Sequence, residues 1–259
     1  MVPWRFLPLE IRNGYWNMAL DEAILEACIE KKSPNTIRLY KWNPSTVSLG
    51  YHQSVSDEVD MAVAKAKKIN VVRRITGGGA VFHDSEGEIT YSIICPSKFF
   101  EIMGYRRVIE QYEIITQGII NALDFFNLKT DKGVIHCPAI FLDGKKFSGN
   151  AQRKRRGYLL QHGTILLEIQ PELMYSVLKA PKNVSTKKMV ASVYAKVIGI
   201  REQIKNFDEN KFISFLIDGF ENALGIQLET GDFSQYELDL AKKLVKEKYN
   251  TEKWLYKYE

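Results

Sequence analysis

The 259-residue sequence is poor in cysteine and has no long apolar run. Its three cysteines, Cys28, Cys95 and Cys137, lie far apart and form no Cys-x-x-Cys pair, so we expect neither a disulfide scaffold nor a zinc site. No run approaches the ~20 apolar residues that span a bilayer, and the first residues lack the basic and apolar segments of a secretory signal. These absences predict a cytoplasmic protein with no membrane partner.

The composition is that of an ordinary globular protein with a mild positive charge. Apolar residues make up 45% and charged residues 26%, and the formal net charge is +5. The run Arg153-Lys154-Arg155-Arg156 suits phosphates, an acidic protein surface or simply solvent. It lacks the interleaved aromatic residues of single-strand binders, so we expect no nucleic-acid partner. A basic, non-enzymatic binding module is the alternative that this run alone supports.

Periodicity predicts strands in the middle of the chain and helices around them. Apolar residues recur at helical spacing over 17–31, with Asn17 as the expected N-cap, and over 56–70 and 106–126. β-prone runs cover 35–42, 45–52, 71–75, 88–96, 139–149 and 157–169. The residues from about 200 to 259 are mostly helical in pattern. Because the strands do not alternate with helices and include a hairpin, we expect an α+β fold with a mixed sheet.

The stretch Arg-Arg-Ile-Thr-Gly-Gly-Gly-Ala-Val-Phe-His-Asp at 73–84 raises the question of a phosphate site. It matches neither the P-loop nor the dinucleotide fingerprint, since Phe82 stands where the third glycine of that fingerprint belongs. Consecutive glycines still allow close approach of a ligand and an anion-binding nest of N–H groups. Alternation sends Arg73 and Arg74 to opposite faces, so at most one of them faces such a ligand. A plain turn with solvated arginines explains the composition equally well.

A second cluster lies at residues 136–167. Asp143-Gly144 predicts a type I′ hairpin, and alternation then turns one of Lys145 and Lys146 inward. An inward lysine supplies a localised charge beside an anionic intermediate, whereas a solvated hairpin arm is the ordinary alternative. The small residues Gly149 and Ala151 permit close approach of a ligand.

Two further side chains of this cluster can carry chemistry. His162 lies in a strand between apolar residues, where a hydrogen-bonded core histidine is commoner than a catalytic one. Cys137 is either a buried inert thiol or a nucleophile. His136 is poorly placed to activate it, because neighbouring residues of a strand point to opposite faces.

Together the two clusters resemble the lipoate–protein ligase and octanoyltransferase family, which shares its catalytic fold with the biotin–protein ligases. The resemblance rests on RRITGGGAVFHD at 73–84, DGKKFSGNAQ at 143–152 and LQHGTILL at 160–167, with weaker similarity over nearly the whole chain. It implies a single mixed-sheet catalytic domain over residues 1–259, with flanking helices and no appended accessory domain.

In the ligase branch, lipoate or octanoate is activated with ATP and Mg²⁺ to an acyl-adenylate and passed to one lysine of a carrier. The implied carriers are the lipoyl domain of a 2-oxoacid dehydrogenase E2 and the glycine-cleavage H protein. Lys146 corresponds to the family's lysine at the acyl carbonyl and phosphate. The resemblance also places Arg73 or Arg74, Gly77, Gly78, Gly79, Ala80, His83, Gly149, Ala151 and His162 around the acyl-adenylate.

The sequence departs from the ligase pattern in two ways. Pro138-Ala139 stands where ligases usually carry Asn-Asp, which leaves the metal ligands unknown, and Cys137 precedes Lys146 by nine residues. Cysteine-type octanoyltransferases also place a nucleophilic cysteine ahead of this lysine, at a somewhat longer spacing. The chain also ends where the catalytic domain of ligases ends, so a ligase of this length implies a separate accessory subunit.

The unbroken Gly77-Gly78-Gly79 favours ligases, because cysteine-type transferases tend to carry arginine at one of these positions. We therefore expect a lipoate–protein ligase that releases AMP. The alternative is an ATP-independent octanoyl or lipoyl transferase that works through a Cys137 thioester.

Overall fold

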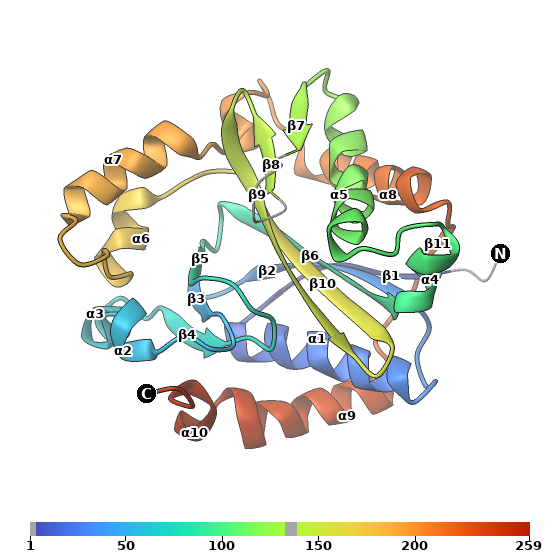
Figure 1. Ribbon diagram of the computed structural model, residues 1–259, viewed down its shortest axis with the longest axis horizontal. Coiled ribbons are helices and arrows are strands. Elements are labelled where there is room, and N and C mark those ends of the chain that lie inside the picture. The colour runs from blue at the N-terminus through green and yellow to red at the C-terminus, as the bar shows by residue number, and fades with distance from the viewer. Residues whose placement is uncertain (1–3, 133–138) are drawn as a thin grey trace.

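The computed structural model describes residues 4–132 and 139–259, which form two sheets with helices around them (Figure 1). The larger sheet has eight strands in the order β11-β1-β2-β6-β10-β9-β8-β7. In that order their bounds are Leu228–Thr230, Trp4–Arg12, Thr36–Trp42, Glu88–Pro96, Tyr158–Leu166, Lys145–Arg155, Ala139–Leu142 and Thr130–Lys132. β1 runs parallel to β2 and β11, and the other neighbouring pairs are antiparallel. The expectation of a mixed sheet is confirmed.

The smaller sheet has three strands in the order β4-β3-β5, with bounds Asn70–Arg73, Thr46–Leu49 and Val81–His83. β3 is parallel to β4 and antiparallel to β5. The glycines at 77–79 belong to the connection from β4 to β5. This sheet therefore carries the glycine loop, which we define as residues 74–80.

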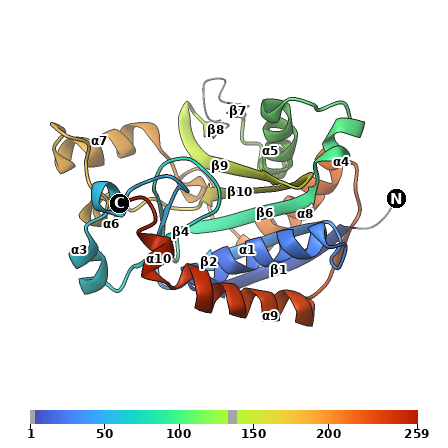
Figure 2. The same ribbon diagram turned by 60° about the horizontal axis from the view of Figure 1, so that its bottom comes forward.

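Two pairs of helices cover opposite faces of the larger sheet (Figure 2). One pair is α1 (Gly14–Ile29) and α9 (Gln235–Leu244), and the other is α5 (Val108–Asp124) and α8 (Glu209–Leu224). Alternation along β2 explains how both faces are apolar: Ile37 and Leu39 pack on the α5–α8 side, whereas Tyr40 and Trp42 pack on the α1 side.

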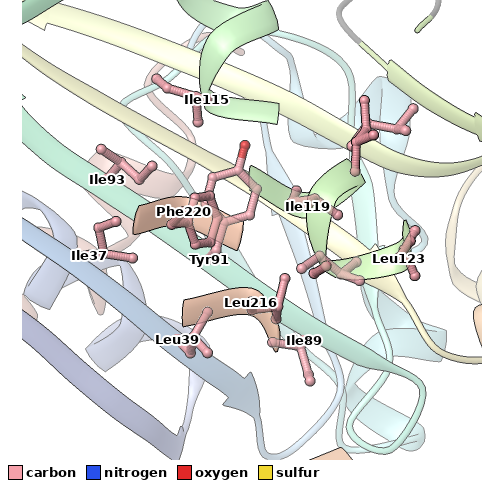
Figure 3. Close-up of a cluster of buried hydrophobic side chains, with 14 of the residues drawn as sticks. Ile37, Leu39, Ile89, Tyr91, Ile93, Ile115, Ile119, Leu123, Leu216 and Phe220 are labelled. Atoms are coloured by element: carbon pink, nitrogen blue, oxygen red, sulfur yellow. The ribbon is translucent and has the colours of Figure 1, made fainter. Parts of the chain in front are cut away.

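The core under α5 and α8 joins residues of β2, β6 and both helices (Figure 3). The two helices meet at Gly118 and Gly219. A Cβ on Gly118 would lie 2.3 Å from the ring of Phe220, and one on Gly219 would lie 2.2 Å from the Gly118 carbonyl oxygen. Glycine at both positions lets the helices approach closely and cover β6, which is the neighbour of β10.

The remaining helices and helical turns lie outside these two pairs. They are α2 (Val55–Glu58), α3 (Met61–Ala66), α4 (Ser97–Ile102), α6 (Pro171–Val177), α7 (Thr186–Lys196), a 3₁₀ turn (Ile200–Glu202), a π-helical turn (Val245–Tyr249) and α10 (Glu252–Leu255). None of the helices in the described part of the chain combines the length and apolar character needed to cross a bilayer.

The start of the first helix was predicted wrongly. Asn13, not Asn17, is the N-cap, and its side chain accepts a hydrogen bond from the Trp16 N–H. Asn17 is buried, and its amide donates to the carbonyls of Arg12 and Lys41. Because α1 is buried between the sheet and α9, apolar periodicity marks its ends poorly.

The predicted helix at 56–70 is two helices, α2 and α3. Ser54 and Asp60 each accept a hydrogen bond from the N–H three residues later, so each caps a separate helix. Val59 between them is extended, with φ −128° and ψ 135°. The acidic start and basic end of this range therefore do not belong to one helix.

The tight hairpin prediction is confirmed. Asp143 and Gly144 have φ of 50° and 71°, as a type I′ turn requires, and Leu142 pairs with Lys145 across it. The chain after residue 200 is mostly helical, as expected, although β11 returns to extend the larger sheet beside β1. This added strand had no clear sequence signal, since it has only three residues.

Candidate active site

A cavity of about 360 Å³ lies between the glycine loop and strands β9 and β10. Most of the residues that the sequence pointed to line it: Arg74, Gly78, Gly79, Ala80, His83, Lys146, Gly149, Ala151 and His162. Apolar side chains complete the walls, among them Met18, Trp42, Phe82, Leu166, Met174 and Val193. Arg73 and Gly77 are not among the residues that form these walls. A mostly apolar cavity with a few polar groups suits a small ligand with an apolar body.

The glycine loop exposes its backbone to this cavity. Gly78 has φ of +95°, in the region that glycine tolerates best. A Cβ on Gly50, opposite the loop, would lie 1.8 Å from the Gly78 carbonyl oxygen, so the approach depends on that second glycine. Within the described residues, the N–H groups of Gly77, Gly78 and Gly79 have no hydrogen-bond acceptor. The loop can therefore offer N–H donors to a ligand.

The two arginines before the loop point apart, as alternation predicted. Arg73 is buried, and its Nε donates to the carbonyl oxygens of Trp254 and Leu255, at 3.0 and 3.1 Å. Arg74 turns to the cavity side, and its Nη2 donates to the carbonyl oxygens of Gly77 and Gly79, at 2.7 and 2.8 Å. Arg73 thus binds the C-terminal segment, which we define as residues 252–259, while Arg74 holds the glycine loop.

His162 belongs to a buried polar network on β10. Its Nδ1 lies 3.1 Å from Asp21 Oδ2, and its Nε2 lies 2.7 Å from Thr76 Oγ1. Burial lowers the pKa of His162 by more than the Asp21 contact raises it, so the ring is neutral at neutral pH. A carboxylate can only accept, so the ring proton lies on Nδ1. His162 is thus a hydrogen-bonded core residue whose edge reaches the cavity.

His83 makes a similar arrangement on β5. Its Nδ1 lies 2.7 Å from Glu88 Oε1 and its Nε2 lies 2.8 Å from Ser48 Oγ. The ring stacks on Trp42, with centroids 4.0 Å apart and planes 16° from parallel. These contacts on both edges and one face hold the imidazole in a single orientation at the cavity wall.

The hairpin lysines also point apart. Lys146 lines the cavity and folds back over Gly149, where a Cβ would lie 3.1 Å from its Nζ. Lys145 turns away and donates from Nζ to the Tyr194 carbonyl oxygen at 3.1 Å. Ala151 pairs with His162 across β9 and β10, so its small side chain stands beside that ring. One inward and one outward lysine is the arrangement that alternation predicted.

The candidate nucleophile Cys137 lies outside the described residues, as do its neighbours His136 and Pro138. Cys28 and Cys95 are buried. Burial raises the pKa of Cys28 to about 12 and that of Cys95 well above the ordinary value. These two cysteines are therefore inert core residues, as their positions in a helix and a strand suggested.

The basic run at 153–156 lies on the β9–β10 hairpin. Arg155 pairs with Glu26, whereas the Arg153 guanidinium lies over the Tyr51 ring, 5.3 Å from its centroid. Lys154 and Arg156 are exposed, so two of the four cations contact neighbouring side chains and two face solvent.

Sequence reasoning missed four side chains of the site: Asp21, Ser48, Thr76 and Glu88. Asp21 is an acid within a helical segment, where nothing in the local sequence marks it, yet it is 1% exposed. The only signal was chemical, because a buried histidine such as His162 requires partners for both ring nitrogens. Which residues supply them depends on long-range pairing, since Asp21 and His162 are 141 positions apart.

Comparisons with known proteins identify the relatives of this chain. A model of the lipoyl protein ligase A/B catalytic domain matches residues 13–221. Octanoyltransferase LipM of Anoxybacillus flavithermus is 35% identical and that of Bacillus subtilis 33% identical, each over 98% of both chains. A bipartite lipoate protein ligase studied with its E2 lipoyl domain, from Thermoplasma acidophilum, has a TM-score of 0.86 at 26% identity, over 100% of this chain and 98% of that one. A lipoate-protein ligase A bound with ATP has a TM-score of 0.84 at 25% identity, over all of both chains.

The expectation of an ATP-dependent, AMP-releasing ligase is wrong. Curated relatives at 32–35% identity over nearly the full chain are octanoyltransferases, which favours the transferase alternative. ATP and Mg²⁺ were expected only for the ligase and are withdrawn with it. The error came from the weight given to Gly77-Gly78-Gly79. A thioester carbonyl and an acyl-adenylate carbonyl both call for close backbone N–H groups, so intact glycines do not distinguish the two reactions.

Proposed function

Because the chain belongs to the lipoyl protein ligase A/B catalytic family, we propose that it is an octanoyl or lipoyl transferase that modifies lipoyl domains. It takes the acyl group from a thioester donor, holds it on Cys137 and passes it to one lysine of the acceptor. The acceptor is the lipoyl domain of a 2-oxoacid dehydrogenase E2 or an H protein. The observation that carries this proposal is the full-length similarity to octanoyltransferases.

The reaction divides into two acyl transfers. In the first, the Cys137 thiolate attacks the donor carbonyl, a carbon–sulfur bond forms to Cys137, and the donor leaves as a thiol after gaining a proton. In the second, the neutral amine of the acceptor lysine attacks the enzyme thioester. A carbon–nitrogen bond forms, the bond to Cys137 breaks, and the amine proton passes to the departing sulfur. Covalent catalysis of this kind replaces one difficult step with two easier ones.

The cavity supplies groups suited to this chemistry. Its volume of about 360 Å³ and its apolar walls fit a short acyl chain. We assign Lys146 to the acyl carbonyl, where its positive charge stabilises the oxyanion that develops during the reaction. The rest of the proposed acyl site is formed by the backbone of Gly78, Gly79 and Ala80 and by His83, Gly149, Ala151 and His162.

The test is formation of an acyl-enzyme. Incubation with the octanoyl thioester of an acyl-carrier protein, without ATP, is expected to add one octanoyl group to Cys137 by peptide mass spectrometry. Adding a lipoyl domain then discharges the adduct and produces the octanoyl domain. Cys137→Ala is expected to abolish both steps, with Cys28→Ala as the matched control. Full activity of Cys137→Ala would exclude the thioester mechanism.

A further inference from the structure

We propose that Arg74 is a positioning residue that aims two backbone N–H groups, those of Gly78 and Ala80, at the thioester carbonyl. Two carboxylate–imidazole–hydroxyl chains converge on it, and we call them the Asp21 chain and the Glu88 chain. This inference rests on the proposed transferase function and deepens it. It concerns how the oxyanion is stabilised, not which residue carries the acyl group.

The Asp21 chain runs through His162 and Thr76 to the Arg74 Nε, which donates to Thr76 Oγ1 at 3.1 Å. A guanidinium can only donate, so the Thr76 oxygen accepts from it and the hydroxyl proton is free to go to the imidazole. The neutral ring of His162 donates from Nδ1 and accepts this proton at Nε2. Each member therefore fixes the direction of the next hydrogen bond.

The Glu88 chain runs through His83 and Ser48 to a second nitrogen of the same guanidinium. Arg74 Nη1 donates to Ser48 Oγ at 3.1 Å and to the Ser48 carbonyl oxygen at 2.8 Å. In the tautomer that donates Nδ1–H to Glu88, the His83 Nε2 accepts the Ser48 proton. Arg74 is thus held from two sides by side chains that are 1% exposed or less, Ser48 and Thr76.

The third nitrogen of Arg74 is the one that orients the glycine loop. Nη2 donates to the carbonyl oxygens of Gly77 and Gly79. In a trans peptide the carbonyl and the following N–H point in opposite directions. The N–H groups of Gly78 and Ala80 therefore point away from Arg74, and both residues line the cavity.

Two backbone N–H groups that point the same way can both donate hydrogen bonds to one oxyanion. When sulfur or amine attacks the thioester, the carbonyl oxygen gains the electron pair of the C=O bond, and it returns that pair when the leaving group departs. Donors that are already oriented stabilise this charge without reorganising during the reaction. The two chains keep Arg74, and through it the loop, in that orientation.

The test removes one hydroxyl from each chain. Thr76→Val and Ser48→Ala are each expected to lower kcat for octanoyl transfer to a lipoyl domain about 10- to 100-fold, less than the loss of an oxyanion donor itself, with little change in KM for the octanoyl thioester. Thr76→Ser restores the hydroxyl and is expected within about threefold of wild type. In the double variant Thr76→Val/Ser48→Ala, the fold-loss in kcat is expected to be smaller than the product of the two single-variant losses, because both hydroxyls act through Arg74.

The matched control is Thr116→Val. Thr116 is also buried, but its hydroxyl bonds only to carbonyl oxygens of its own helix, those of Tyr112 and Glu113. If Thr76→Val and Ser48→Ala match this control in kcat, or if Thr76→Ser is as impaired as Thr76→Val, the inference is refuted. Should Thr76→Val fail to fold, Ser48→Ala decides by the same comparison. Wild-type protein that transfers no octanoyl group refutes the proposed function instead.

Discussion

The carboxylate of Asp21 offers the sharpest test of how the site is held together. It accepts four hydrogen bonds, from Arg38 Nη1 at 3.0 Å, Tyr40 Oη at 2.9 Å, Ser92 Oγ at 2.9 Å and His162 Nδ1 at 3.1 Å. Arg38 is completely buried, so Asp21→Asn leaves a buried cation without its counter-charge. Removing one partner of such a pair costs about 3–5 kcal/mol. At about 2–4 °C per kcal/mol for a chain of this size, we expect the melting temperature to fall by roughly 10 °C.

The pH dependence of this loss follows from the pKa of Asp21. Burial raises that pKa, but the His162 hydrogen bond and the Arg38 charge together lower it by more, so the pKa of Asp21 lies below its ordinary value. A lowered pKa in the folded state contributes stability that is complete above the unfolded value of about 3.9 and is lost as the pH falls through the folded value. The difference between wild type and Asp21→Asn is therefore expected to narrow as the pH falls below about 4.

The measurement is urea unfolding followed by tryptophan fluorescence at each pH, with thermal melts beside it. Asp124→Asn serves as the control, because Asp124 is an exposed acid at the end of α5. We expect that control to differ from wild type by less than about 0.5 kcal/mol. A loss below about 1 kcal/mol for Asp21→Asn at about pH 7, or a difference that grows as the pH falls below about 4, would show that the Asp21–Arg38 pair does not hold the network.

Two further predictions concern the lysines and the cysteines. Lys146→Met is expected to lower octanoyl transfer by about 10²–10³, while Lys145→Met stays within about threefold, because only Lys146 faces the cavity; equal losses in a steady-state assay would contradict the assignment. Iodoacetamide at about pH 7.5 is expected to leave Cys28 and Cys95 unmodified in the native protein, since burial raises both thiol pKa values. Peptide mapping before and after denaturation checks this, and native alkylation of either residue would contradict it.

Local sequence rules predicted the parts of the fold that local physics determines. Asp143-Gly144 specified its turn because few residue pairs accept positive φ twice in succession. Alternation separated Lys145 from Lys146 and Arg73 from Arg74. The same rules failed at Asn17, where burial by neighbouring elements replaced the expected capping role.

The candidate site was predicted only in part, because some of its polar partners come from distant positions. Glycine, lysine and histidine stand out in the sequence by their chemistry. Ser48 and Asp21 occupy ordinary strand and helix positions, and only the pairing of β3 with β5 and the packing of α1 on β10 bring them to a histidine. Glu88 lies only five residues from His83, but its position at the start of a strand does not distinguish it from a surface acid. The pattern of one element does not carry that information.

The contact between Arg73 and the C-terminal segment has a consequence for biosynthesis. Arg73 donates to the carbonyls of Trp254 and Leu255, and the Trp254 indole N–H donates back to the Arg73 carbonyl, across 181 positions of the chain. At about 5–20 residues per second, roughly 10–40 s of translation separate the two partners. During that interval the nascent chain already contains the glycine loop but not the segment that holds the strand before it. The strand before the glycine loop therefore gains these hydrogen bonds only after synthesis has passed Trp254 and Leu255.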